Sequence, residues 1–244
     1  MGQLVWDASQ RRDHAASAAY LDQAVNAARA TRNAVAEANA LLRKSYLALY
    51  GTKRPTAGLV LTTRAAMVSR TDSHVIAGLA QLHHAEAHAM LGNERDCSEA
   101  LGDAEDHLAA VEAGDPATAL FCPSHYARLV GSCWLLLQKP VEAVAALESA
   151  RQLIAARRKS TAVILGNLAL AEILQREVDA ATSHLHQAID VIEETRAAGG
   201  LNLAFAAARQ LRPWRDEPLG PGGHRPPAHS HDPLGVQDDQ PRRH

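Results

Sequence analysis

The sequence of this chain predicts an all-α fold, and three observations lead to that prediction. One arrangement recurs along the chain: a polar break followed by a helix with a small residue, a Leu and an Ala on one face. Proline and glycine fall between apolar runs of helical period. No convincing run alternates apolar and polar residues as a β-strand does. Stacked helical hairpins account for all three observations, because fixed-period self-similarity is typical of repeat architectures.

The recurring arrangement places three residues at positions 0, +4 and +7 of a helix. These positions lie on one helix face, so the face is expected to pack against neighbouring helices. Three sets are regular, the fourth is less clean, and the fifth has a register uncertain by a residue or two. In that order the sets are Cys97, Leu101 and Ala104; Ala143, Leu147 and Ala150; Ala181, Leu185 and Ala188; Ser17, Leu21 and Ala24; and Gly58, Thr62 and Ala65.

Proline and glycine positions give the expected element boundaries. Asp72 or Ser73 is expected to cap the helix that follows, and Asp115 before Pro116 has the pattern of a cap with proline at the first helical position. A short helical turn is expected over 117–121. The longer helices are expected over residues 3–10, 14–31, 33–50, 56–69, 73–91, 94–112, 123–138, 140–156, 159–176, 178–197 and 200–211.

The end of the chain has a different composition. Seven of the eleven prolines lie within 213–241. Such a segment buries too little apolar surface to offset its chain entropy. We therefore expect a helical repeat domain over 1–215 and a disordered Pro/Gly/His-rich tail over 216–244.

Composition and charge restrict the class of protein. The net charge of −2 and the pI of about 6.7 argue against a surface that binds nucleic acid directly. No stretch of apolar residues is long enough to cross a membrane, and the first residues do not form a signal peptide. The three cysteines are interpreted as buried thiols in a reducing compartment. These features predict a cytoplasmic protein.

The spacing of small residue, Leu and Ala resembles that of tetratricopeptide repeats over about residues 3–211. Ala85, Gly131 and Ala169 fall where such repeats carry a small residue on their first helix. The resemblance implies a right-handed α-solenoid of about five hairpins closed by a capping helix. The intervals between equivalent Ala residues, 41, 39, 46 and 38, exceed the usual repeat of about 34 residues, which longer helices and loops would explain.

Several segments are similar to the repeat region of actinobacterial transcriptional regulators of the Xre helix-turn-helix type. They are residues 85–92, 114–121, 131–133 and 211–214. The resemblance implies a link to transcriptional regulation. A helix-turn-helix domain is not found in the sequence, so the chain is interpreted either as a standalone repeat protein or as the sensor part of a shortened gene.

The histidines raise the hypothesis of a metal site. His84 and His88 have the i, i+4 spacing that binds zinc, but the order His-Glu-x-x-His of metalloproteases is absent and no third ligand is indicated. Surface and groove histidines are the favoured interpretation. Because no nucleophile elbow, phosphate-binding loop or dinucleotide motif occurs either, we expect no enzymatic activity, no cofactor and no resident metal.

The expected functional surface is the groove lined by the first helix of each hairpin. Polar residues within these otherwise apolar helices are the candidates for binding a partner. Asn167 stands out, because Asn is a poor residue in mid-helix and its amide both donates and accepts hydrogen bonds; the resemblance implies that it holds a peptide backbone. The candidates are Asn39, Arg43, Glu86, His125, Arg128, Ser132 and Asn167.

Three functional hypotheses remain open at this point. The first is a regulatory protein that binds a peptide, a protein partner or a second copy of itself in the groove. The second is a structural adaptor, or a remnant of a regulator without its DNA-binding domain. The third is a metal-binding helical protein that uses His84 and His88.

Overall fold

The computed structural model describes residues 13–154, 159–196 and 198–214. Within these ranges the chain forms ten α-helices and no β-strand, which confirms the all-α prediction. The chain divides into two compact units, Met1–Ala156 and Arg157–His244, each described here by itself. The expected helix over 3–10 and the expected tail over 216–244 lie outside the described residues. None of the described helices is both long and apolar enough to cross a membrane.

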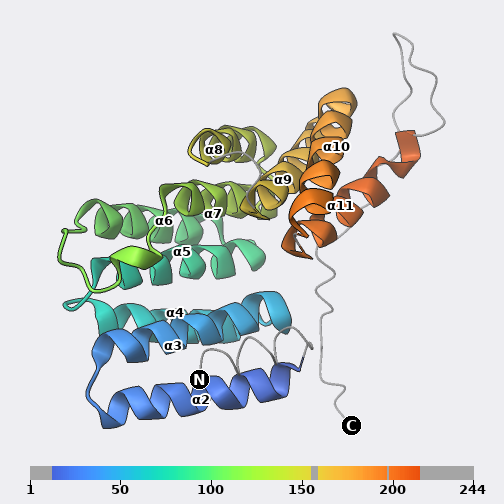
Figure 1. Cartoon of the computed structure of the whole chain (residues 1–244). Helices are drawn as coiled ribbons and strands as arrows, with labels where there is room; N and C mark the ends of the chain where they lie inside the picture. The colour runs from blue at the N-terminus through green and yellow to red at the C-terminus, as the bar shows by residue number, and fades with distance from the viewer. Residues whose placement is uncertain (1–12, 155–158, 197, 215–244) are drawn as a thin grey trace, which may run out of the picture. The chain divides into compact units, whose positions relative to one another are not determined.

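The first unit is a stack of helices in which neighbours along the chain are also neighbours in space (Figure 1). In the view of Figure 1, α2 to α6 lie in chain order from the bottom upward. Its helices are α2 (His14–Ala30), α3 (Ala34–Tyr46), α4 (Pro55–Ser69), α5 (His74–Met90), α6 (Glu94–Ala109), α7 (Pro123–Leu136) and α8 (Pro140–Gln152). Most bounds agree with the expected ranges within about two residues, and the second helices of two hairpins end three or four residues early.

One departure from the expected elements lies at the end of α3. The sequence predicts one helix over 33–50, but the last turn, Leu47–Gly51, is a π-helix. Its defining contact is the hydrogen bond from Thr52 N to Leu47 O, at 2.9 Å, which spans five residues. Single π turns are frequent at functional sites. This turn carries Tyr50, which belongs to the site described below.

The turns inside three successive hairpins share one backbone conformation. After α5, α7 and α9, a residue with positive φ ends the helix: Gly92, Gln138 and Arg176. In each case the backbone N–H of the next residue donates a hydrogen bond of 2.8 to 3.0 Å to the carbonyl oxygen five residues earlier. The pairs are Asn93 N to His88 O, Lys139 N to Trp134 O and Glu177 N to Glu172 O. This is the Schellman arrangement, which satisfies helix-terminal carbonyls. The hairpin is therefore a structural repeat, although only one of the three positions is glycine.

The expected packing face of the second helices is buried. In α6, α8 and α10 (Val178–Thr195) every residue of the recurring sets is at most 7% exposed. In α4, Thr62 and Ala65 are fully buried, so the fifth set keeps the same register despite its unusual residues. In α2, Ser17 and Leu21 are buried but Ala24 is only half-buried. The register predicted from the sequence is thus confirmed in four sets and weakest in α2.

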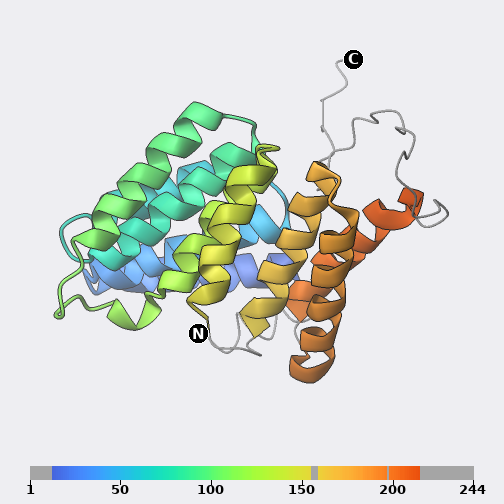
Figure 2. The same cartoon turned by 90° about the horizontal axis from the view of Figure 1, so that it is seen from above.

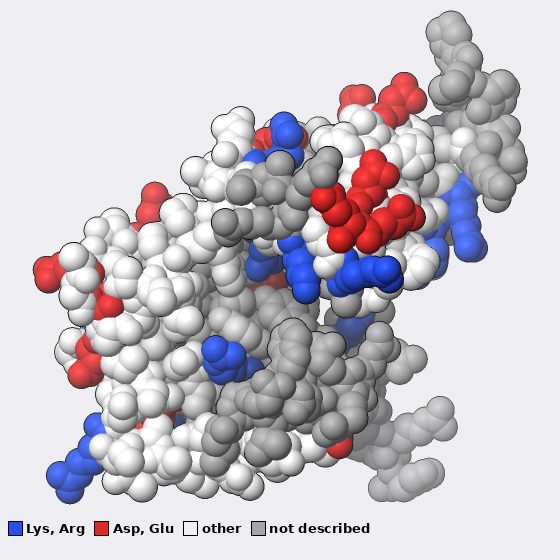
Figure 3. Space-filling model, in the orientation of Figure 1, with Lys and Arg blue, Asp and Glu red and all other residues white. Residues whose placement is uncertain are grey.

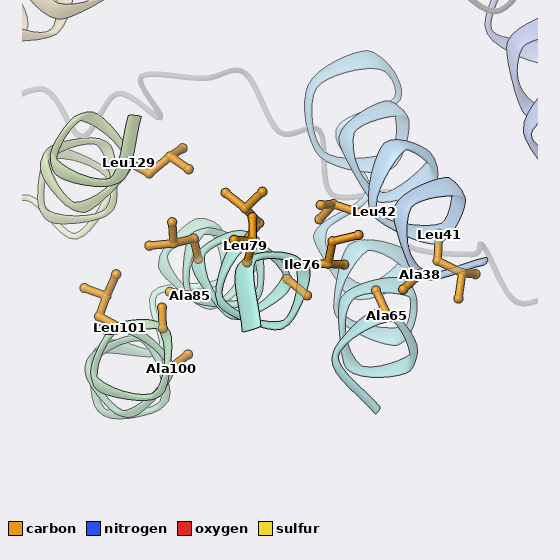
Figure 4. Close-up of a cluster of buried hydrophobic side chains, with 14 of the residues drawn as sticks. Ala38, Leu41, Leu42, Ala65, Ile76, Leu79, Ala85, Ala100, Leu101 and Leu129 are labelled. Carbon is orange, nitrogen blue, oxygen red and sulfur yellow. The ribbon is translucent and has the colours of Figure 1, made fainter. Parts of the chain in front are cut away.

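Helix α5 is the centre of the core of the first unit. Twelve of its seventeen residues are buried. Figure 4 shows Leu79 and Ala85 of α5 between Leu101 and Leu129 on one side and Leu42 and Ala65 on the other. These contacts join α3, α4, α6 and α7 to one helix, so the polar residues of α5 are held by apolar contacts on several sides.

The second unit consists of α9 (Lys159–Gln175), α10, α11 (Ala198–Leu211) and a short 3₁₀ turn, Arg212–Trp214. Helices α9 and α10 lie side by side in both views (Figures 1 and 2). Glycine allows α11 to approach α9 closely: a Cβ on Gly166 would lie 2.7 Å from Leu203, and one on Gly200 would lie 2.5 Å from Ala162. The carboxylate of Glu172 accepts from His184 Nδ1 at 2.8 and 2.9 Å and ties α9 to α10.

The loop before α7 is fastened to the start of α5. Asp115 accepts hydrogen bonds from Ser73 Oγ at 2.8 Å, from Val75 N at 3.1 Å and from Ala117 N at 2.8 Å. Ser73 is itself the N-cap of α5, as expected. The short helical turn expected over 117–121 is confirmed as a 3₁₀ turn, Thr118–Leu120, although it begins after Pro116 and not at it. The helix α7 begins at Pro123, as expected. The Asp115 carboxylate satisfies free N–H groups at two places, Ala117 N before this turn and Val75 N at the start of α5.

Asp115→Asn is expected to lower the free energy of unfolding by about 1 kcal/mol at pH 7, because the amide has one acceptor oxygen where the carboxylate uses both, and a donor at the start of α5 is left without its acceptor. Burial alone would raise the pKa of Asp115, but its backbone and Ser73 hydrogen bonds outweigh burial and lower the pKa below the ordinary 3.8. The stabilisation is therefore complete above pH 3.8 and is lost as the pH falls through the folded-state pKa. Urea unfolding of both proteins at pH 7 and at low pH measures this difference.

The matched control for this prediction is Asp72→Asn. Asp72 is exposed just before α5, and its carboxylate accepts a hydrogen bond only from the neighbouring Thr71 hydroxyl, at 3.0 Å, within the described chain. Its replacement is expected to change stability by less than about 0.5 kcal/mol at either pH. Equal effects of the two substitutions would contradict the role given to Asp115.

Candidate functional site

A buried polar cluster lies where α3, α5 and α7 meet in the first unit. These three helices are the first helices of successive hairpins, and α5 packs against both of the others. Each contributes polar residues spaced three or four apart, which places them on one face of that helix. The cluster consists of Tyr46 and Tyr50 from α3 and its π turn, His83 and Glu86 from α5, and His125 and Arg128 from α7.

Glu86 is the centre of the hydrogen bonds in this cluster. Its side chain is only 6% exposed. Oε2 accepts a hydrogen bond from the Tyr50 hydroxyl, and His83 Nδ1 lies 3.1 Å from the same oxygen. The Tyr50 hydroxyl is also 3.1 Å from His83 Nδ1. Because an ionised carboxylate only accepts hydrogen bonds, the proton between His83 and Glu86 is on Nδ1.

Aromatic rings enclose this group of hydrogen bonds. The centroid of the Tyr46 ring is 4.3 Å from that of His83, and the His125 ring meets His83 edge to face at 6.2 Å. Tyr50 also contacts His83 edge to face, at 6.0 Å. Such tilted arrangements are the favoured geometry for ring pairs. His83 is thereby fixed in position by contacts from all three helices.

The environment shifts the pKa values of the cluster in opposite directions. Burial alone would raise the pKa of Glu86, but the hydrogen bond and charge of His83, the Tyr50 hydroxyl and the charge of Arg128 together lower it. Burial, followed by the positive charges of Arg128 and His83, lowers the pKa of His125 to about 4. At neutral pH, Glu86 is therefore ionised and His125 is neutral.

Both tyrosines remain protonated at neutral pH. Burial, with a smaller contribution from Glu86, raises the pKa of Tyr46 to about 12 against the lowering effect of Arg43. Although 49% of the Tyr50 side chain is exposed, its hydroxyl is enclosed against Glu86. This local burial and the Glu86 carboxylate raise the pKa of Tyr50 well above its ordinary value. Tyr50 thus joins the buried carboxylate to the surface of the protein.

Hydrogen-bonding capacity remains unused in the cluster. Nε2 of His83 and Nε2 of His125 are both buried and have no hydrogen-bond partner among the described residues. The guanidinium of Arg128 forms neither an ion pair nor a hydrogen bond within the described chain. A buried polar atom without a partner costs about 1 to 3 kcal/mol. Each such group in a folded protein needs an explanation, such as a bound water, an ion or a role at a functional site.

Comparison with protein-family models, curated proteins and solved structures gave no match.

The structure places six of the seven predicted site residues in the first unit. Glu86, His125 and Arg128 meet in the cluster, and Arg43 lies close enough to Tyr46 to lower its pKa. Asn39 lies two turns before Tyr46 on α3, and Ser132 one turn after Arg128 on α7. Both extend the same helix faces beyond the cluster.

Asn167, the seventh candidate, is on α9 in the second unit. Its side chain is only 5% exposed. Asn167 is therefore not a solvated residue of the helix surface. The structure does not supply a partner peptide for its amide, so the peptide-holding role stays a prediction.

Three residues of the cluster were not among the sequence candidates: Tyr46, Tyr50 and His83. The aromatic residues have the size and apolarity of core residues, so the sequence does not distinguish them from packing. His83 is adjacent in sequence to the conspicuous pair His84 and His88, but it points to a different helix face. Its i, i+3 spacing to Glu86 was the one feature of the sequence that could have indicated it.

Two buried cysteines lie beside the cluster. Cys97 of α6 and Cys133 of α7 are fully buried, whereas Cys122 is exposed, so the expectation of three buried thiols is wrong for Cys122. Contact with Cys97, burial and the Glu86 charge raise the pKa of Cys133 well above its ordinary value. Because the thiolate is the reactive form, these surroundings oppose nucleophilic chemistry at Cys133.

The surface around the stack is weakly charged on the face shown in Figure 3. On the described part of the first unit visible there, uncharged residues cover most of the surface and basic side chains lie apart from one another. A continuous basic surface, which is typical of nucleic-acid binding, is not seen on that visible part.

Proposed function

We propose that this chain is a non-enzymatic, tetratricopeptide-like repeat protein that binds a peptide or protein partner on the face formed by α3, α5 and α7. The main observation that supports this proposal is the polar cluster formed by residues of these three helices. Its members come from the first helices of successive hairpins, which line one side of a stack of this kind. The proposed fold is a right-handed solenoid, supported by the repeated hairpin turn and the common packing register.

The cluster is suited to binding because some of its side chains are held rigidly and others have hydrogen-bonding groups without a partner among the described residues. Glu86 and His83 are held by hydrogen bonds and ring contacts, which limits the entropy lost on binding. None of the five N–H donors of Arg128 is used within the described residues, and Tyr50 of the same cluster is half-exposed. Tyr and Arg are the residue types that most often dominate binding energy at protein interfaces.

The cellular setting is proposed from the resemblance of the sequence alone. The similarity of several segments to the repeat regions of actinobacterial regulators favours a role in transcriptional control, with the partner acting as the input. A structural adaptor without a ligand is the alternative, and it predicts that the cluster serves folding only.

Arg128→Ala is expected to weaken binding of a peptide partner by about tenfold or more, since hydrogen bonds from a charged group contribute about 1.5 to 3 kcal/mol. Peptides are first selected on the whole protein from a random display library. Their dissociation constants are then measured on the wild type and the variant by fluorescence anisotropy.

Arg95→Ala is the matched control, because Arg95 is on α6, its side chain is 88% exposed and it forms an ion pair with the exposed Glu99 at 2.9 Å. This substitution is expected to change the dissociation constant by less than twofold. If selected peptides bind the Arg128 variant as tightly as the wild type, the proposed binding face is wrong. If selection yields no specific peptide, the adaptor hypothesis is favoured.

A further inference from the structure

A second group of histidines lies on another face of α5, away from the site described above. His84 and His88 are one turn apart, and their Nε2 atoms approach to 3.2 Å. The ring centroids are 4.7 Å apart, with the ring planes at 81°. Neither residue is fully exposed, and the His88 side chain is only 14% exposed. The two imidazoles therefore face each other through one nitrogen each.

The other nitrogen of His84 is held by the preceding helix. Nδ1 lies 2.9 Å from the hydroxyl oxygen of Thr62, which is fully buried in α4. That hydroxyl also lies 3.0 Å from the carbonyl oxygens of Gly58 and Leu59. The Thr62 proton goes either to one of these carbonyls, so that Nδ1–H of His84 donates to Thr62, or to Nδ1 of His84 itself. In the first of these two tautomers the lone pair of His84 is on Nε2.

The other nitrogen of His88 faces the following helix. Nδ1 lies 3.6 Å from Oδ2 of Asp96 in α6, whose negative charge favours a proton on that nitrogen. The Asn93 amide lies 3.5 Å from the same atom and can present its oxygen by rotation of the side chain. Hydrogen bonding of one ring nitrogen to a carboxylate or hydroxyl is the arrangement that orients metal-binding histidines through the other.

The two Nε2 atoms, 3.2 Å apart, are joined either by an N–H···N hydrogen bond, when one ring has its proton on Nε2, or by a cation bound to both lone pairs. A metal bound to histidine at 2.0 to 2.1 Å in tetrahedral geometry holds its two nitrogens about 3.3 Å apart. The observed separation is therefore close to the one that a shared metal needs. A shared proton is the competing occupant, and it would keep the same pair in contact.

We propose that His84 and His88 form a two-histidine site for a divalent transition metal that prefers nitrogen ligands, such as Zn²⁺, with Thr62 and Asp96 orienting the rings. The sequence offered only the spacing of the two ligands; the structure adds the facing nitrogens and a partner for each outer nitrogen. Within the described residues, no group of three or more His, Cys, Asp or Glu side chains could complete a metal site. The remaining coordination positions are therefore left to water or to another exchangeable ligand.

Titration of the whole protein with Zn²⁺ in a calorimeter tests the proposal. His88→Ala is expected to remove one equivalent of bound metal relative to the wild type, because a single imidazole cannot chelate. Thr62→Val, which keeps the shape of the side chain but not its hydroxyl, is expected to weaken binding by about tenfold or more. Circular dichroism of each variant verifies that the helices remain folded.

His107→Ala is the matched control within the same hairpin. His74 and His107 also form a close histidine pair, with Nδ1 atoms 3.3 Å apart, but the pair is exposed and spans α5 and α6. The His107→Ala protein is expected to bind the one equivalent of Zn²⁺ that the His88→Ala protein loses. Each variant lacks one histidine, so weak binding of Zn²⁺ by the remaining histidines is the same in the two proteins. Equal binding by the wild type and the His88 variant, or loss of the equivalent in the His107 variant, overturns the proposal.

Discussion

Glu86→Ala is expected to lower the free energy of unfolding of the first unit by about 3 kcal/mol, because it removes the acceptor of two hydrogen bonds and each donor left unsatisfied costs about 1 to 3 kcal/mol. The substitution leaves the Tyr50 hydroxyl and His83 Nδ1 without their shared acceptor in a place that water hardly reaches. At about 2 to 4 °C per kcal/mol for a protein of this size, the melting temperature should fall by roughly 6 to 12 °C. Thermal and urea unfolding followed by circular dichroism measure both quantities.

Two further variants separate the carboxylate charge from general effects of the substitution. Glu86→Gln keeps an acceptor for Tyr50 but removes the charge, and we expect about half the loss of the Ala variant. Glu99→Ala removes a carboxylate that is 63% exposed on α6, so its effect should stay below about 0.5 kcal/mol. A Glu86→Ala protein as stable as the Glu99→Ala protein would show that the cluster does not hold α3, α5 and α7 together.

The contribution of Glu86 also has a defined pH dependence. Its pKa in the folded protein is lowered below the ordinary value of 4.5. The stabilisation is therefore complete above pH 4.5 and is lost as the pH falls through the folded-state value. The difference between wild type and Glu86→Gln should accordingly be constant near neutral pH and shrink in acid.

The helices were predictable because local rules decide where they begin and end. Pro55, Pro123 and Pro140 each stand at the first helical position of the element that follows, where proline is favoured. The recurring 0, +4, +7 pattern predicted which residues of α6, α8 and α10 are buried. Even Thr62 occupies the expected buried position, since its hydroxyl bonds back to the Gly58 carbonyl one turn earlier.

The cluster was only partly predictable, because it depends on contacts between distant parts of the chain. Tyr50 reaches Glu86 across 36 residues and His83 across 33 residues. No periodicity within one helix encodes such a contact. The π turn that carries Tyr50 has no distinctive sequence either. Glu86, His125 and Arg128 were found because polar residues inside apolar helices stand out without knowledge of their partners.

Asp115 shows how tertiary contacts override a local rule. Asp followed by Pro predicts a helix start, yet the carboxylate is used by Val75 N and Ser73 Oγ, about forty residues earlier in the chain. The same carboxylate also accepts from Ala117 N, so it serves the turn that follows it and the start of α5 together. Local capping patterns therefore identify the residue type that satisfies free N–H groups, but not which groups it satisfies.

Leu147→Ala is expected to lower the free energy of unfolding by about 2 to 5 kcal/mol, because Leu147 is fully buried and the substitution leaves a cavity between α7 and α8. The Gly131 backbone lies against this side chain. A Cβ on Gly131 would approach Leu147 Cγ to 2.5 Å and Cδ2 to 2.8 Å. Gly131→Ala alone should therefore destabilise the protein by about 1 to 3 kcal/mol through overpacking.

The double variant is expected to reverse the sign of the Gly131 substitution. Without the Leu147 side chain, the closest remaining neighbour of the new methyl group is the Ala143 carbonyl oxygen at 3.3 Å, a contact that a small shift relieves. Ala also favours the helix over Gly by about 1 kcal/mol. Gly131→Ala should thus stabilise the Leu147→Ala protein, and urea unfolding of the four proteins gives a coupling energy of about 2 kcal/mol.

Gly102→Ala serves as the reference for helix propensity, because Gly102 is exposed on α6 and a Cβ there meets no atom within 4 Å. It should stabilise the wild type and the Leu147→Ala protein equally, by about 0.5 to 1 kcal/mol. If Gly131→Ala behaves like Gly102→Ala in both backgrounds, Gly131 does not face Leu147. The register that places Ala143, Leu147 and Ala150 against the preceding helix would then be wrong, and with it the hairpin on which the proposed repeat is built.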